Sequence, residues 1–384
     1  MAGGVTIVGS GLGGYTLARE LRKQDRRCPI TVLTADGGEL YSKPMLSNAF
    51  QERREPDALV LKGAEQAAQE LGATVLRRTR VTAIDRARKV LHIADHAEVA
   101  YDRLVLAIGA DPRPYSVPGG DRVPIVTVND LDDYRRWRQS LIPGGRVLLI
   151  GAGLIGCEFA NDLSVGGYRV AIVDPAPWPL GRLLPQLLGR QLEQALTECG
   201  IVVHCRRSVS QVVASAAGGF VAVLDDGSEV SFDRALSAIG LMPRTGLAVA
   251  AGLTVDRGIV VDRNSRTSDP AIFAIGDCAQ GEAGPLPFIL PLMAQTRALA
   301  ATLNGNDTPL VMPAMPIVVK TACLPVVVCP PPTNMAGQWQ IDGEGADRKA
   351  LFLDNQGRAQ GFALSGAAAA ERQALAKEMP NLLG

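Results

Sequence analysis

Residues 5–14 read VTIVGSGLGG, and this short stretch decides the fold. Its first four residues are typical of a strand, and residues 15–23 are typical of a helix. Between them, Gly9 permits a tight turn, Gly11 lets a pyrophosphate approach the backbone, and Gly14 lets the helix pack on the strand. The N-terminus of such a helix offers unpaired N–H groups to an anion. The stretch therefore predicts the first half of a βαβ unit that binds a dinucleotide.

The same order returns at residues 146–156, which read RVLLIGAGLIG, and a helix is expected from about residue 157 to 163. Two copies of the motif predict two nucleotide sites. The residues assigned to the second site from this motif are Gly151, Gly153, Ile155 and Gly156.

An acidic residue follows each motif at about the 20-residue distance expected for a carboxylate that binds a ribose hydroxyl. Asp36 stands 22 residues after the first motif, and Asp174 stands 18 residues after the second. Asp36 is alternatively a turn residue before Gly37. A carboxylate at Asp174 accepts bonds from a 2′-hydroxyl and repels a 2′-phosphate, so we expect NADH to be preferred over NADPH. Arg182, in the following loop, is the residue that would favour a 2′-phosphate.

Two matched segments suggest how the chain is divided. Residues 101–109 (YDRLVLAIG) mirror residues 232–240 (FDRALSAIG), and each follows a predicted β-meander. Prolines follow Gly109 and Gly240, the glycines that end these two segments. Proline stiffens extended links between domains. From about residue 309, short β-branched runs alternate with prolines, and an Ala-rich helix is expected after Ser365. We therefore expect an α/β protein with two Rossmann-like domains, the second inserted into the first, and a small α+β C-terminal domain.

Composition excludes several classes of function. Lys and Arg total 39, as do Asp and Glu, and aromatic residues make up 4%, so nucleic-acid binding is not expected. No apolar run reaches the roughly 20 residues that cross a bilayer, and no leader precedes the first strand, so we expect a cytoplasmic protein without membrane insertion. The seven cysteines show no CxxC pair. His92, His96 and His204 lie in the meander regions at spacings that suit no metal site.

Residues 267–277 read TSDPAIFAIGD and complete an ordered set of five features. Together these features resemble the pyridine-nucleotide flavoprotein reductases, whose dinucleotide domains are of the glutathione-reductase type. In that family an aspartate at the position of Asp277 binds the ribityl chain of FAD. The resemblance implies an FAD-binding domain at residues 1–113 and 243–308, an NAD-binding domain at 114–242 and a C-terminal domain at 309–384. It adds Ala107, Gly109 and Gly276 to the FAD site and Gly240 to the NAD site.

The branch of this family is decided by the segment after Asp36, where some members carry one or two redox-active cysteines. Residues 41–48 of this chain read YSKPMLSN, and no cysteine lies between Cys28 and Cys157. Serine and asparagine cannot cycle to a disulfide or a sulfenic acid. Electrons are therefore expected to leave the flavin directly.

Three further segments, GAGLIGCEFAND at 151–162, PLM at 291–293 and VKT at 319–321, are most similar to rubredoxin–NAD⁺ reductases. The resemblance covers nearly the whole chain and implies electron transfer from NADH through FAD to rubredoxin, a one-electron carrier. A ferredoxin reductase is the alternative. Many ferredoxin reductases pair a lysine at the position of Asn48 with a glutamate at that of Glu158, and Asn48 departs from that pattern. A third hypothesis is a redox-regulated binding protein that resembles apoptosis-inducing factor, although the C-terminal domain has no long insertion for such a role.

The resemblance also implies three charged residues beside the flavin. Lys43 is expected near the flavin ring, where its positive charge would stabilise negative charge on the ring. Lys320 is expected to act similarly at the pyrimidine end of the ring, or to pair with Glu158. Glu158 is expected on the nicotinamide side, although a carboxylate in the first turn of a helix is favoured by the helix dipole alone. The motifs leave the oligomeric state open, and a monomer is favoured.

Overall fold

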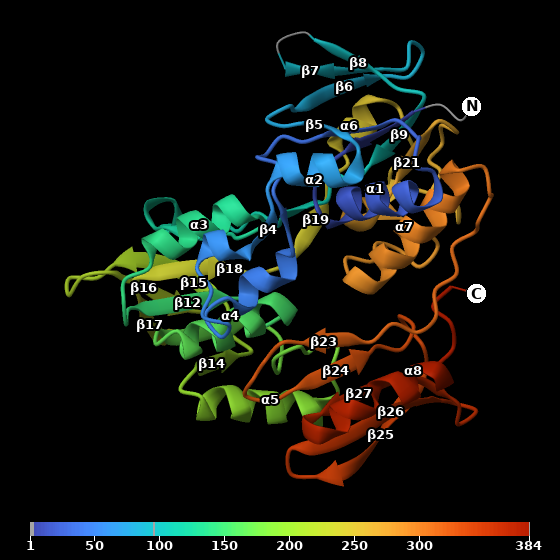
Figure 1. Ribbon diagram of the computed structural model, residues 1–384. Helices are drawn as coiled ribbons and strands as arrows, with labels where there is room; N and C mark the ends of the chain where they lie inside the picture. Colours follow the sequence, from blue (N-terminus) through green and yellow to red (C-terminus); the bar gives the residue numbers. More distant parts are fainter. Residues whose placement is uncertain (1–3, 95–96, 384) are drawn as a thin grey trace.

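The computed structural model describes residues 4–94 and 97–383 (Figure 1). His96, one of the histidines considered above, lies outside these residues, as do the first three residues of the chain. Three units are visible in Figure 1, and the chain passes from the first to the second, back to the first and then to the third.

The first unit is built on a five-stranded parallel sheet in the order β21-β9-β1-β2-β5. Its strands are β1 (Val5–Val8), β2 (Ile30–Leu33), β5 (Thr74–Leu76), β9 (Arg103–Leu106) and β21 (Ile272–Ala274). All four residues of β1 are buried, as expected for a central strand covered on both faces. Helices α1 (Leu12–Gln24) and α7 (Ile289–Leu303) pack against each other on one face of this sheet.

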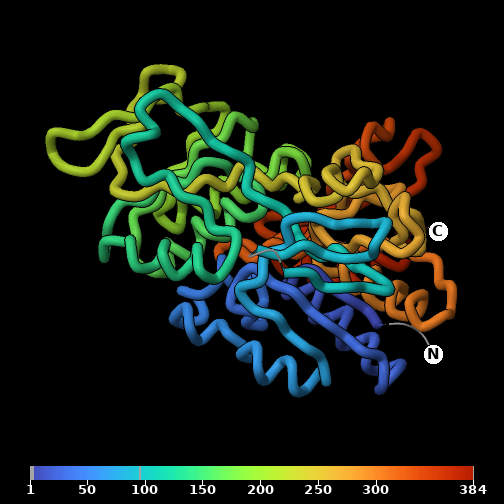
Figure 2. The backbone as a smooth tube through the Cα atoms, turned by 90° about the horizontal axis from the view of Figure 1, so that it is seen from above, coloured from blue at the N-terminus to red at the C-terminus, as the bar shows by residue number. Residues whose placement is uncertain are grey.

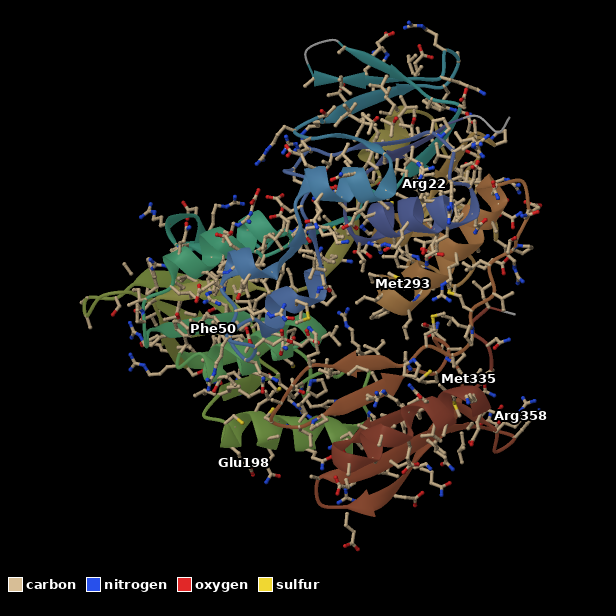
Figure 3. All side chains as sticks on the ribbon, viewed as in Figure 1. Arg22, Phe50, Glu198, Met293, Met335 and Arg358 are labelled. Atoms are coloured by element: carbon tan, nitrogen blue, oxygen red, sulfur yellow. The ribbon has the colours of Figure 1, made fainter. Side chains whose placement is uncertain are left out.

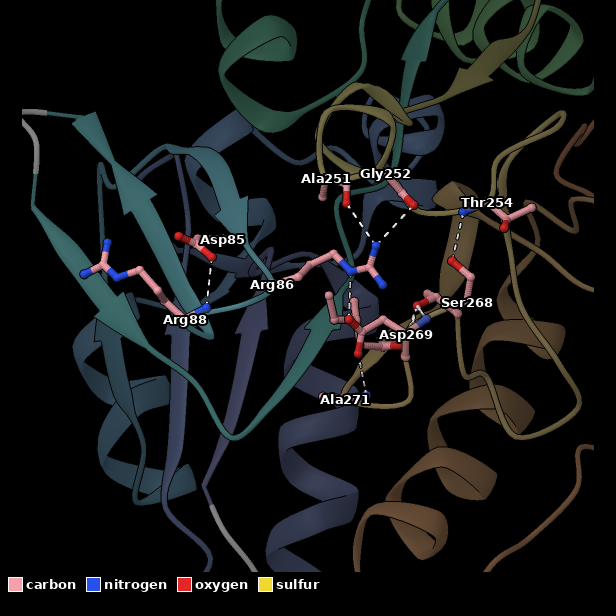
Figure 4. Close-up of polar contacts among 11 residues, drawn as sticks. Asp85, Arg86, Arg88, Ala251, Gly252, Thr254, Ser268, Asp269 and Ala271 are labelled. Atoms are coloured by element: carbon pink, nitrogen blue, oxygen red, sulfur yellow. Dashed lines mark hydrogen bonds and ion pairs between the residues drawn. The ribbon is translucent and has the colours of Figure 1, made fainter.

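A small antiparallel sheet covers the other face of the first sheet. It contains β6 (Val81–Asp85), β7 (Val90–Ile93) and β8 (Glu98–Ala100) and is the meander that the sequence predicted before residue 101. Arg86 attaches this sheet to the rest of the unit, as Figure 4 shows. Its Nε donates to Asp269 Oδ2 at 2.8 Å, and its Nη1 donates to the carbonyl oxygens of Ala251 and Gly252, each at 3.3 Å.

The second unit repeats this plan with the parallel order β11-β18-β12-β13-β14. Its strands are β11 (Ile125–Val126), β12 (Arg146–Ile150), β13 (Arg169–Asp174), β14 (Val202–Cys205) and β18 (Arg234–Ser237). Its helices are α3 (Leu131–Ser140), α4 (Leu154–Val165) and α5 (Gln186–Glu198), and its meander contains β15 (Val209–Ala214), β16 (Phe220–Leu224) and β17 (Glu229–Phe232). His204 lies in β14 of the parallel sheet, so its predicted place in a meander was wrong.

Strand β21 shows that the second unit is inserted into the first, because residues 272–274 pair with β9 of the first sheet. The two links between the units pair with each other as β10 (Ala110–Pro112) and β19 (Leu241–Pro243). Figure 2 shows the inserted unit, teal to yellow-green, extending to one side of the blue strands. The chain is therefore an α/β protein with two Rossmann-like units; the exact domain boundaries stay a prediction.

The third unit is an antiparallel sheet in the order β23-β24-β27-β26-β25. Its strands are β23 (Ile317–Val319), β24 (Val326–Cys329), β25 (Gly337–Glu344), β26 (Asp347–Asp354) and β27 (Ala359–Ser365). The expected Ala-rich helix begins as a 3₁₀ turn, η6 (Gly366–Glu371), and only α8 (Arg372–Glu378) is α-helical. Ile317, Val319 and Val326 share a hydrophobic core with Phe159 and Leu163 of α4, so this unit packs directly on the second.

Short elements complete the described chain. They are β3 (Leu40–Tyr41), η1 (Lys43–Asn48), η2 (Pro56–Leu59), β4 (Val60–Lys62), α2 (Ala64–Leu71), η4 (Gly120–Arg122), α6 (Gly246–Ala250), β20 (Ile259–Val260), η5 (Gly276–Cys278) and β22 (Ala279–Gln280). Of the helices that the structure describes, none combines the length and the apolar character needed to cross a bilayer.

Candidate functional site

One cavity of about 2090 Å³ runs between the three units. Both glycine motifs line it, at the carboxyl ends of β1 and β12, where α/β sheets bind ligands. The sequence-predicted residues that line it are Gly9, Gly11, Asp36, Lys43, Ala107, Gly109, Gly151, Gly153, Ile155, Glu158, Asp174, Gly240, Gly276, Asp277 and Lys320. Gly14 and Gly156 do not line it, because each packs against the first glycine of its own motif.

The fold requires a glycine at the first and last positions of the first motif but not at the middle one. Gly9 has a φ of +115°, and a Cβ there would overlap the Ala107 carbonyl group. A Cβ at Gly14 would overlap the carbonyl oxygen of Gly9. Gly11, by contrast, has a φ of −61°, which any residue adopts. No described atom lies within 4 Å of a Cβ built there. Protein packing does not explain Gly11, whereas a phosphate group at this position does.

In the second motif, too, the fold requires a glycine at the first and last positions but not at the middle one. Gly151 has a φ of +107°, and Gly156 packs on the carbonyl oxygen of Gly151. Gly153 has a φ of −74°, and the space around it is open within 4 Å among the described residues. Gly11 and Gly153 are the N-caps of α1 and α4, and neither helix has a side-chain cap. Both helix ends therefore present backbone N–H groups to an anion, which fits the pyrophosphates of two dinucleotides.

The structure shows Asp36 in the turn role, one of the two roles that the sequence left open. Its Oδ1 accepts hydrogen bonds from the Thr34 hydroxyl at 2.5 Å, the Ser10 hydroxyl at 3.1 Å and the Gly38 N–H at 2.9 Å. These bonds hold the turn after β2. Asp36 also lines the cavity beside the first motif, so its role in binding a ribose hydroxyl stays a prediction.

Asp174 is positioned by the backbone on both sides of its carboxylate. Its Oδ2 accepts from the Ala152 N–H at 2.5 Å, and its Oδ1 accepts from the Ala176 N–H at 2.6 Å. It thus connects the end of β13 to the glycine turn after β12. Arg182 and Arg207 line the same cavity, and Arg207 pairs with Asp226 at 2.5 Å.

We expect the kcat/KM for NADH to exceed that for NADPH, because Asp174 would repel a 2′-phosphate. Replacing Asp174 with alanine should lower kcat/KM for NADH by about 10- to 100-fold, which corresponds to the loss of about 1.5–3 kcal/mol of charged hydrogen bonding. Steady-state kinetics with both nucleotides measures this. Arg182→Ala is the control and should leave the NADH value unchanged. A wild-type preference for NADPH would contradict the assignment of Asp174.

Glu158 and Lys320 form an ion pair where the three units meet, with the carboxylate buried and the lysine partly exposed. The side chain of Glu158 is 1% exposed, and its Oε2 lies 2.6 Å from Lys320 Nζ. Its Oε1 accepts from the Lys320 backbone N–H at 3.0 Å. From the first unit, the Ser47 hydroxyl donates to Glu158 Oε2 at 2.6 Å, and Lys320 Nζ also donates to the Pro44 carbonyl oxygen. The predicted alternative in which Lys320 pairs with Glu158 is what the structure contains.

Asn48 does not replace the missing lysine of the ferredoxin-reductase pattern. It is buried, and its Nδ2 donates to Glu52 Oε1 at 3.3 Å. The cation beside Glu158 comes instead from Lys320, 162 positions further along the chain. The third unit therefore supplies the charge that the first unit lacks.

Lys43 and Asp277 line the cavity on its first-unit side, and their charges act on each other. Lys43 Nζ donates to Asn129 Oδ1 at 2.6 Å, and the Asn129 side-chain amide donates to the Ala110 carbonyl oxygen at 2.9 Å. Burial lowers the pKa of Lys43, and the Asp277 carboxylate opposes that change. Burial raises the pKa of Asp277, and Lys43 opposes that change in turn. The structure brings these two predicted residues into one site.

Three polar residues of the cavity were missed by the sequence analysis: Ser47, Asn129 and Ser237. Ser47 and Asn129 gave no local signal, because their partners lie in other units. Ser237 had one: it is a hydroxyl in an apolar strand, at the position where the mirrored segment has Leu106. Ser237 is among the residues that line the cavity, and its Oγ is buried without a hydrogen-bond partner in the described chain. A polar ligand beside Ser237 would give this hydroxyl the hydrogen-bond partner that it lacks in the described chain.

No cysteine is among the residues that line the cavity in the described part of the chain. The two thiols nearest to the motifs in sequence, Cys157 and Cys278, are buried. The Cys157 thiol donates to the Ala152 carbonyl oxygen at 3.3 Å. Within residues 4–94 and 97–383, no group of three or more His, Cys, Asp or Glu side chains is arranged to hold a metal ion.

Comparisons with known proteins match nearly the whole chain. Residues 4–298 match the family described as pyridine nucleotide-disulphide oxidoreductase, and residues 309–379 match the rubredoxin binding C-terminal domain. The chain is 42% identical over 384 residues, 99% of each protein, to the rubredoxin-NAD(+) reductase of Alcanivorax borkumensis. It is 39% identical over 386 residues, 99% of this chain and 98% of the relative, to the protein of that name from Acinetobacter baylyi. The solved covalent putidaredoxin reductase–putidaredoxin complex matches with a TM-score of 0.88 at 27% identity, covering 97% of this chain and 92% of that one.

Proposed function

The chain belongs to the pyridine nucleotide-disulphide oxidoreductase family, and we propose that it is an oxidoreductase that takes electrons from NADH through FAD and delivers them to rubredoxin. The observation that carries this proposal is the position of Lys320. A residue of the rubredoxin-binding match, 309–379, reaches into the cavity that both glycine motifs line. The unit that resembles a carrier-binding domain therefore also forms part of the cofactor site.

The residues of the cavity suit FAD beside the first motif and NADH beside the second. When bound, FAD supplies a ring that accepts two electrons together and releases them singly. The chain would hold its phosphates at Gly11 and those of NADH at Gly153. Lys43 and Asp277 would face the first dinucleotide, and the Glu158–Lys320 pair would close the cavity between the two.

The mouth of the cavity suits a transient carrier. Val318 is 51% exposed, and Leu290 is 50% exposed, although the neighbours of Val318 in β23 are buried. Both residues line the cavity. A small apolar contact that lets the carrier approach the opening is typical of redox encounters, which bury little area. A cytoplasmic location is part of the same proposal, because rubredoxin would have to be available where the protein resides.

Stopped-flow mixing of the NADH-reduced protein with purified rubredoxin or ferredoxin tests the proposal. We expect rapid reoxidation by rubredoxin and slow reoxidation by ferredoxin. Val318→Asp should slow reoxidation by rubredoxin about 10-fold or more without changing reduction by NADH, because it places a charge in the contact. Val311→Asp is the matched control, since Val311 is 56% exposed and lies outside the cavity. Fast reoxidation by ferredoxin alone would favour a ferredoxin reductase. A reduced state that neither carrier reoxidises would favour the redox-regulated binding protein.

A further inference from the structure

Two of the seven cysteines form a pair at the contact between the second and third units. Cys199 follows α5 directly and is exposed, whereas Cys323 lies in the link between β23 and β24 and is half-buried. The Cys199 thiol acts on the Cys323 thiol electrostatically, so the two groups are neighbours. Both are free thiols, 124 positions apart in the sequence.

Helix α4 positions both cysteines by their backbones. The Ser164 hydroxyl donates to the Cys199 carbonyl oxygen at 2.8 Å, and the Cys323 N–H donates to Asn161 Oδ1 at 3.2 Å. Asn161 and Ser164 are three residues apart and therefore lie on one face of the helix. Figure 3 labels Glu198, the last residue of α5 and the neighbour of Cys199, on the lower side of the molecule. The pairing is thus held by the packing of two units rather than by one flexible loop.

The buried thiols of the described chain differ from this pair because the core encloses them. The thiols of Cys157 and Cys278 are buried and donate to backbone carbonyl oxygens. A thiol enclosed in this way is reached neither by a peroxide from solvent nor by a second thiol. Cys199, in contrast, is open to a reagent from solvent and has a second thiol beside it.

We propose that Cys199 and Cys323 are a redox modification site, at which a peroxide drives formation of an intramolecular disulfide. In the first step, the Cys199 sulfur attacks hydrogen peroxide, becomes a sulfenic acid and releases water. In the second step, the Cys323 sulfur attacks that sulfenic sulfur, which releases a second water and leaves the S–S bond. The two thiols lose two electrons and two protons in total, and one peroxide is reduced to two waters.

The bond would tie the second unit to the third, three residues beyond Lys320. It would act on the packing of the C-terminal unit and not on the flavin, since neither cysteine lines the cavity. This inference does not depend on which carrier the protein serves. Because burial, followed by the neighbouring Cys199, raises the pKa of the Cys323 thiol to about 12, the second step should accelerate as the pH rises through the alkaline range.

Peptide mapping of the peroxide-treated full-length protein under non-reducing conditions tests the proposal. Trypsin releases residues 191–206 and 321–348, and the expected product is these two peptides joined, at the summed mass less two hydrogens. Dithiothreitol should separate them. The oxidised protein should also unfold at a temperature higher by about 5 °C, because the bond closes a long loop.

Each tryptic peptide contains a second cysteine, Cys205 or Cys329, so single variants assign the bond. The joined peptide should disappear in Cys199→Ser and in Cys323→Ser and should persist in the matched controls Cys205→Ser and Cys329→Ser. Circular dichroism and FAD absorbance show that each variant is folded. If the joined peptide persists without Cys199, or if peroxide converts Cys199 only to a sulfinic acid, the proposed pair is wrong.

Discussion

Gly11→Val is expected to give a folded protein that purifies with little or no FAD. The backbone of Gly11 has a φ of −61°, and a Cβ built there meets no described atom within 4 Å, so we expect the fold to tolerate valine. The side chain would instead occupy the space through which a pyrophosphate approaches the N-terminus of α1. We expect the Kd for FAD to rise about 100-fold or more, a loss of about 2.7 kcal/mol. Flavin absorbance per protein and titration of the flavin-free protein measure this.

Gly63→Val is the matched control. Gly63 is also an exposed N-cap glycine with open space around it, it has a φ of −67°, and it lies outside the cavity. This variant measures the cost of valine at an N-cap and should keep its FAD. Gly153→Val should do the reverse of Gly11→Val, retaining FAD while the KM for NADH rises about 100-fold. If the Gly11 variant retained its full FAD content, FAD would not bind at Gly11 as predicted.

The glycine motifs were predictable because their requirement is local. A positive φ at Gly9 and the close contact between Gly14 and the carbonyl group of Gly9 arise within ten residues of chain. The same locality explains the small errors. Helices α1 and α4 begin at Leu12 and Leu154, earlier than predicted, because the glycines themselves are the N-caps. The helix propensity of a segment predicts that a helix forms there, whereas the geometry of the N-cap determines its first residue.

The charged centre was only partly predictable because its contacts are distant in sequence. Glu158, Lys43 and Lys320 were identified through the family resemblance, and so was the Lys320–Glu158 pair, but the partners Asn129 and Ser47 were not. Lys43 binds Asn129, 86 positions away, and Glu158 binds Ser47, 111 positions away. Such contacts depend on how three units pack, and no periodicity in a single segment encodes that packing. Asn48 shows most clearly how little a single segment reveals. The cation that is absent at this position is supplied by Lys320 of the third unit.

Lys320→Met is expected to destabilise the protein by about 3–5 kcal/mol, because it leaves the Glu158 carboxylate buried without its cation. Glu158 is 1% exposed, and the remaining bonds from Ser47 and the backbone of residue 320 do not neutralise it. Denaturant unfolding measures the free energy. Lys349→Met is the matched control, because Lys349 pairs with Glu371 at 2.8 Å while the two side chains stay 34% and 49% exposed. Exposed pairs contribute about 0–1 kcal/mol, so the control should change little.

A double variant separates loss of the pair from loss of packing. Glu158→Gln with Lys320→Met removes both charges, and the uncharged amide can still bond to Ser47, so most of the lost stability should return. Reduction by NADH gives an independent readout, because the pair lines the same cavity as both glycine motifs. If charge beside the flavin matters for the reaction, the double variant should regain stability while its rate of reduction stays low. If the rate returns together with the stability, the pair acts only by holding the third unit on the other two.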